Sequence, residues 1–109
     1  MTDVDRAFAK TREQIVNAVT KSIGEAAEAI RDEARRNVPV DTGRLRDNIV
    51  AKVDEKQAKV GVFDRDSYYA MFVEFGTSDQ QAQPFLGPAA ELERSRLVKR
   101  IQKNVEESL

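Results

Sequence analysis

A long amphipathic pattern at the N-terminal end constrains this chain more than any other feature. Between residues 3 and 37, apolar side chains recur at spacings of three, four and seven residues, which predicts one long helix over this range. The stripe is narrow and rich in alanine, and consists of Phe8, Ile15, Val19, Ile23, Ala26, Ile30 and Ala34. Pro39 disfavours helical backbone in the residue before it and has no amide donor, so the helix should end near Val38.

Charged side chains are predicted to cover the other face of this helix. They are Glu25, Glu28, Arg31, Asp32, Arg35 and Arg36. The segment after Pro39, from Val40 to Gly43, contains Asp and Thr oxygens that can cap backbone amides. It therefore reads as an ordered loop.

The rest of the chain predicts a hairpin followed by two further helices. Residues 48–54 and 58–63 alternate between apolar and polar side chains, which is typical of two antiparallel strands. The short apolar run 68–75 fits a buried strand or two turns of helix, and we favour a helix that ends at Gly76. Pro84 and Pro88 bracket the start of a last helix. Its predicted apolar positions are Ala90, Leu97, Ile101 and Val105, and its predicted exposed basic positions are Arg94, Arg96, Lys99, Arg100 and Lys103.

These elements predict a single α+β domain over residues 1–109. In it, the long N-terminal helix packs on a small antiparallel or mixed sheet, accompanied by a short central helix and a C-terminal helix. A domain of this length buries only part of its chain's surface, so oligomerisation is a natural source of extra stability.

The composition restricts the chemistry that the chain can perform. There is no histidine and no cysteine, which removes the commonest general base near neutral pH and the main transition-metal ligands. Only carboxylate, Lys, Tyr or Ser/Thr chemistry remains possible. Lys and Arg number 18 against 19 Asp and Glu, so no basic field favours specific nucleic-acid binding. No apolar run approaches the length of a membrane span, so we expect a soluble protein.

Two carboxylates, those of Asp41 and Glu74, are nevertheless candidates for a catalytic role. Asp41-Thr42-Gly43 matches the tripeptide of retroviral-type aspartic proteases, which are dimers of similar length. Those enzymes hold the Asp in an all-β fold, whereas this tripeptide follows a long predicted helix. Glu74, within an apolar run, would be the other candidate for an aspartate- or glutamate-dependent hydrolase. A pairing with Arg44, Arg46 or Arg65, or with loop amides, is the structural alternative for Glu74.

The pair Phe85-Leu86 lies between two prolines that fix the local backbone. These apolar side chains either fill the core of the domain or anchor a partner, and base rates favour the core. The basic residues of the last helix are diluted by Glu91, Glu93, Glu106 and Glu107, which favours a solvated face.

Three segments, in this order and at this spacing, resemble one known family. They are Val38-Pro39-Val40-Asp41-Thr42-Gly43-Arg44-Leu45-Arg46-Asp47-Asn48-Ile49, then Tyr69-Ala70 with Val73-Glu74-Phe75-Gly76-Thr77, then Ala82-Gln83-Pro84-Phe85-Leu86 with Pro88-Ala89. The chain is similar over almost its whole length to the tail-completion (head–tail joining) family of long-tailed double-stranded DNA phages, prophages and gene transfer agents. Gly87 departs from the larger or basic residue usual before the second proline, which implies a looser start of the last helix.

The resemblance implies a non-enzymatic structural protein of the virion neck, made in the host bacterial cytoplasm. It also implies no cofactor, no metal site and no catalytic residue. It implies a ring of subunits, with a hexamer as one candidate, between the tail tube and the head connector, and DNA could pass through such a ring. A monomer in isolation would fit a marginal interface that neighbouring proteins stabilise. Contacts are expected from residues 38–47 and 76–86. The alternatives are the small hydrolase above and an oligomeric adaptor outside virions. The positions carried over from the family are Asp41, Thr42, Gly43, Leu45, Tyr69, Glu74, Gly76, Thr77, Pro84, Phe85 and Pro88.

Overall fold

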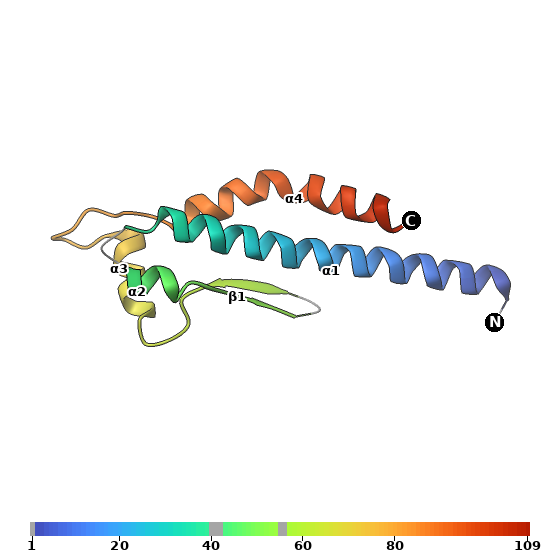
Figure 1. The fold of residues 1–109 in the computed structure, drawn as a ribbon, viewed down its shortest axis with the longest axis horizontal. Helices are drawn as coiled ribbons and strands as arrows, with labels where there is room; N and C mark the ends of the chain where they lie inside the picture. The colour runs from blue at the N-terminus through green and yellow to red at the C-terminus, as the bar shows by residue number, and fades with distance from the viewer. Residues whose placement is uncertain (1, 40–42, 55–56) are drawn as a thin grey trace.

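The computed structural model describes residues 2–39, 43–54 and 57–109, and it has the predicted α+β fold. The elements, in chain order, are α1 (Asp3–Asn37), α2 (Gly43–Asp47), β1 (Val50–Val53), β2 (Ala58–Gly61), α3 (Ser67–Phe75) and α4 (Leu86–Ser108). Figure 1 shows α1 as the axis of the molecule, with α4 along one side and the β1–β2 hairpin along the other. The short helices α2 and α3 lie together near the C-terminal end of α1.

The long helix α1 begins and ends as predicted. Its first turn is closed by a capping box, in which the Asp5 amide donates to Thr2 Oγ1 at 3.2 Å and the Thr2 amide donates to the Asp5 carboxylate at 3.3 Å. The last helical residue is Asn37, and the Val38 amide still donates to the Ala34 carbonyl at 3.1 Å. Val38 itself has extended backbone, as expected before Pro39.

The hairpin is antiparallel, and its strands are shorter than predicted. Val50 pairs with Gly61 and Val53 with Ala58, and the described residues form a sheet of only these two strands. Residues 48 and 49 do not join β1 because their amides donate to carbonyls of α2. Both strands contact α1, so the predicted packing of helix on sheet is confirmed.

Residues 43–47 form the helix α2, which was not predicted from the sequence. The predicted loop ended at Gly43, and residues 44–47 were assigned to no element. Val40, Asp41 and Thr42 lie outside the described residues. The short helix places Leu45 in the core with only 2 % of its surface exposed. Arg44 forms a 3.0 Å ion pair with Asp66, whose carboxylate also accepts from Asn48 Nδ2 at 2.9 Å, and this links α2 to the residue before α3.

Helices α1 and α4 pack through a polar network that the sequence analysis missed. Asn104 Nδ2 donates to Ser22 Oγ at 2.9 Å and to Glu25 Oε1 at 2.8 Å. Arg100 pairs with the buried Glu93 and, at 3.7 Å, with Glu25. The prediction that Arg100 and Glu25 lie on solvated faces was therefore wrong, because each charge has its partner across the helix interface.

Arg35 is a second exception on the predicted charged face of α1. Its guanidinium reaches β1 and donates to the Ile49 carbonyl through Nη2 at 2.8 Å. Ile49 belongs to the core, and its carbonyl lies just before the first residue of β1. The side chain therefore ties the end of α1 to the start of the hairpin.

The N-terminal part of α1 extends beyond the rest of the molecule (Figure 1). The Gln14 side chain donates to the Ser108 carbonyl at 3.0 Å, which marks where α4 ends against α1. The molecule measures 67 × 25 × 21 Å and has a radius of gyration of 18.2 Å, against about 13 Å for a compact chain of this length. Phe8, on the predicted apolar stripe, is consequently 72 % exposed.

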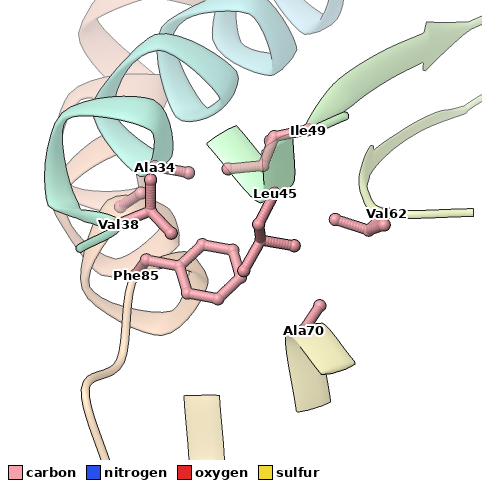
Figure 2. Packing of buried hydrophobic residues seen from close by; sticks show 8 residues of the cluster. Ala34, Val38, Leu45, Ile49, Val62, Ala70 and Phe85 are labelled. Atoms are coloured by element: carbon pink, nitrogen blue, oxygen red, sulfur yellow. The ribbon is translucent and has the colours of Figure 1, made fainter. Parts of the chain in front are cut away.

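The hydrophobic core lies at the opposite end of the molecule, where all elements meet. Its buried members are Ala34, Val38, Leu45, Ile49, Val62, Ala70, Phe85 and Ala89. Figure 2 shows the Phe85 ring in this cluster beside Leu45 and Val38. Side chains from α1, α2, α3 and the start of α4 thus share one core.

Candidate functional site

The three motif segments of the sequence converge on the core end of the molecule. Leu45 and Phe85 are its largest fully buried side chains, so both serve the fold and neither is free to contact a partner. This agrees with the expectation that Phe85 fills the core of the domain. Leu86, the other residue between the two prolines, is partly buried and packs against the same cluster.

Glu74 joins α3 to the start of α4. Its Oε1 accepts from the Phe85 amide at 3.0 Å and from the Leu86 amide at 2.8 Å, and its Oε2 accepts from the Gly87 amide at 3.0 Å. No side chain of the preceding residues caps α4, so this carboxylate from another helix fills the role. Of the predicted roles for Glu74, the pairing with loop amides is the one present.

Gly87 makes this arrangement possible. A Cβ atom built at residue 87 would lie 3.2 Å from Glu74 Oε2, which is tighter than an ordinary contact. Glycine at residue 87, where the family usually has a larger side chain, therefore leaves room for the Glu74 carboxylate. The predicted looser start of the last helix is not seen, because three amides there are bonded to Glu74.

The segment after α3 is an ordered loop held by backbone bonds. Gly76 has φ of 77°, and a Cβ there would lie 2.7 Å from the Ala82 amide nitrogen, so glycine is required. Thr77 Oγ1 accepts from the amides of residues 79 and 80 at 3.2 and 3.0 Å. The Gln83 amide donates to the Val73 carbonyl at 2.8 Å. Gly76 and Thr77 therefore have structural roles in shaping this loop.

The remaining motif residues lie at or near the surface. Tyr69 is part of a shallow hollow of about 210 Å³ that also includes Pro39 and side chains of the loop after α3. Pro84 and Pro88 are exposed on either side of the buried Phe85. Gly43 begins α2, and Asp41 and Thr42 lie outside the described residues. Tyr69, Pro84 and Pro88 are thus the motif positions that are free for contacts.

Helix α3 presents an apolar face to solvent that the sequence analysis did not identify. Tyr68, Met71, Phe72 and Phe75 are 46–76 % exposed. Their spacing of i, i+3, i+4 and i+7 places them on one side of the helix, which we call the α3 face. Only Ala70 of this helix is buried. The spacing itself was the signal available in the sequence, which was used only to weigh a helix against a buried strand.

A groove with apolar walls lies on α1 between the hairpin and α4. Its volume is about 350 Å³, and we call it the apolar groove. The residues around it carry no charge, and they are Ile23, Ala26, Ala27, Ile30, Ala58, Val60, Leu86, Ala90 and Leu97. Ala26 and Ala27 of the alanine-rich stripe on α1 line it.

The described residues form neither a metal-ion site nor a membrane-spanning helix. They contain no group of three or more acidic side chains arranged to hold a metal ion. No helix in the described ranges has both the length and the apolarity to cross a membrane.

Comparison with known proteins identifies a family for most of the chain. The model of the family described as bacteriophage HK97-gp10-like, a tail component, matches residues 3–76. That range covers α1, the hairpin and α3, and it ends at the glycine that follows α3. No curated protein and no solved structure matches the chain. The match spans more than half of the chain and is consistent with the tail-completion resemblance, so the protein belongs to the HK97-gp10-like family of phage tail components.

Proposed function

We propose that this tail component caps the head-proximal end of the tail and joins it to the head connector as a ring of subunits. Membership of a phage tail family supports a general role as a tail component and a location in the virion. The resemblance of the three motif segments to tail-completion proteins supports the more specific position at the neck. Tail tube and connector proteins would be its partners, and DNA would pass through the ring.

The shape of the subunit supports assembly with other chains. A protein that works alone buries its apolar helix faces, whereas this one exposes the whole α3 face. Exposed apolar surfaces on an elongated subunit are typical of a protein completed by its neighbours.

The proposal also holds that the protein is not an enzyme. Both oxygens of Glu74 accept hydrogen bonds from backbone amides, which gives this carboxylate a structural task. The Asp-Thr-Gly proteases require an all-β dimer, and the described residues form an α+β fold. No observation favours the hydrolase over the structural role.

Particles assembled without the protein provide the test. The gene is deleted in the phage or prophage that encodes it, and lysates are imaged by electron microscopy. Finished heads beside unjoined tails, or beside tails of unregulated length, are expected, and the wild-type gene supplied in trans should restore joining. Normal infectious particles from the deletion would refute the proposal.

A further inference from the structure

We infer that the α3 face of one copy of this chain docks in the apolar groove of the next copy, and that this contact forms the ring. The inference rests on the proposed ring and adds to it the two surfaces that meet. One chain carries an exposed apolar helix face and, elsewhere, an apolar groove of similar length.

The α3 face has the anchor pattern of a helix that binds in a groove. Side chains at i, i+3, i+4 and i+7 are the recognised anchors in such contacts, and here they are Tyr68, Met71, Phe72 and Phe75. Aromatic residues and methionine are enriched at the centres of interfaces, whereas charged residues are depleted there. The one charged residue of α3, Glu74, is occupied by the start of α4 within the same chain.

The apolar groove matches this face in length and chemistry. Along α1 the groove extends from Ile23 to Ile30, a separation of seven positions, and the first and last anchors of α3 are also seven positions apart. Each span corresponds to a rise of about 10 Å along a helix. Neither surface contains a charged residue, so docking would leave no charge unpaired. The small side chains of Ala26, Ala27 and Ala90 leave space for the rings of the partner.

The two surfaces belong to different elements, and this difference determines the symmetry of the assembly. A contact between unlike surfaces is heterologous, and successive heterologous contacts close into a ring when the rotation allows. The same face paired with itself would give only a two-fold dimer.

The size of the contact predicts its strength. From its fractional exposure, the α3 face offers roughly 500 Å² of surface. Most residues of the apolar groove are buried or half-buried, so the groove offers less, and one contact would bury less than about 1,000 Å² in total. This is below the usual size of a stable interface, so a single contact should be weak. The isolated chain should therefore be largely monomeric at low concentration, and ring closure or attachment to the tail should be needed for assembly.

Chemical cross-linking tests the contact directly, because the native chain has no cysteine. A double variant, Met71→Cys with Ala90→Cys, places one thiol on each surface, and both positions are exposed. A short bis-maleimide linker, applied to concentrated protein, should join this variant into a ladder of multimers. Each single variant should stay monomeric. The control Met71→Cys with Lys99→Cys places the second thiol nine residues further on, half a turn around α4, and should give no ladder.

Two outcomes would overturn the inference. One is the absence of a ladder at all protein concentrations, and the other is dimerisation of the Met71→Cys single variant, which would indicate α3 against α3. Phe75→Asp, added to the double variant, should reduce the ladder about tenfold by placing a charge in the contact. The matched control is Phe8→Asp, which should leave the ladder unchanged. Phe8 and Phe75 are 72 % and 76 % exposed, but Phe8 lies at the other end of the molecule, outside both surfaces.

Particle assembly separates this inference from the proposed function. If the ladder forms and Phe75→Asp reduces it about tenfold, but particles carrying Phe75→Asp join heads to tails normally, the contact stands and the proposed role in joining fails. If Phe75→Asp blocks joining but no ladder forms, the joining role stands. The α3 face then binds another tail protein, and the inference is wrong.

Discussion

The cap that Glu74 places on α4 should be a large single contribution to the stability of this domain. Glu74→Gln removes the negative charge from three backbone amides and turns one acceptor oxygen into a donor group. A hydrogen bond to a charged group contributes about 1.5–3 kcal/mol, and loss of a helix cap costs about 0.5–2 kcal/mol. Because these effects overlap, we expect a loss of about 2 kcal/mol, or roughly 8–15 °C in Tm.

Thermal unfolding followed by circular dichroism measures this loss. The control is Glu91→Gln, because the Glu91 side chain is 73 % exposed and pairs only with the exposed Arg94, so its change should stay within about 0.5 kcal/mol. Equal shifts for the two variants would refute the capping role of Glu74.

A double-mutant cycle with Gly87 sharpens the test. Gly87→Ala should stabilise a helix by about 0.5–1 kcal/mol through backbone entropy, but its Cβ would lie 3.2 Å from Glu74 Oε2. We expect the gain to appear in a Glu74→Ala background and to be absent or reversed in the wild type. The same gain in both backgrounds would show that the carboxylate does not constrain residue 87.

Three other predictions test the fold. Gly76→Ala should cost about 2 kcal/mol, because the residue has φ of 77° and its Cβ would lie 2.7 Å from a backbone nitrogen, and urea unfolding would show it. Arg100→Met should cost about 3 kcal/mol by leaving Glu93 buried and unpaired, whereas Arg100→Met with Glu93→Met should recover much of the loss in the same assay. Phe85→Ala should cost about 3–5 kcal/mol and Phe8→Ala less than about 0.5 kcal/mol, since the two rings are 0 % and 72 % exposed; equal Tm values for this pair would contradict the assigned core.

The order of all elements but α2 was predictable because each of them has a local signal. Pro39 ends α1 by its own stereochemistry, and alternation of side chains identifies the two strands. Helix α2 was missed because a five-residue helix leaves almost no periodic pattern. The candidate site was predictable only as a set of motif positions, since nothing local to Leu45 or Phe85 distinguishes a core residue from a contact residue.

The sequence alone determined the long helix, its end, the hairpin, the absence of histidine and cysteine chemistry, and the motif order that indicates a phage tail protein. Only the tertiary structure decided which residues face inward. Phe8 and Phe85 are the same residue type, yet one is exposed and the other fully buried, because α4 ends before it can cover the first turns of α1. Burial and charge pairing depend on which segments, distant in the sequence, pack together. The Glu74 cap, the Arg100 network and the exposure of the α3 face all result from these tertiary contacts.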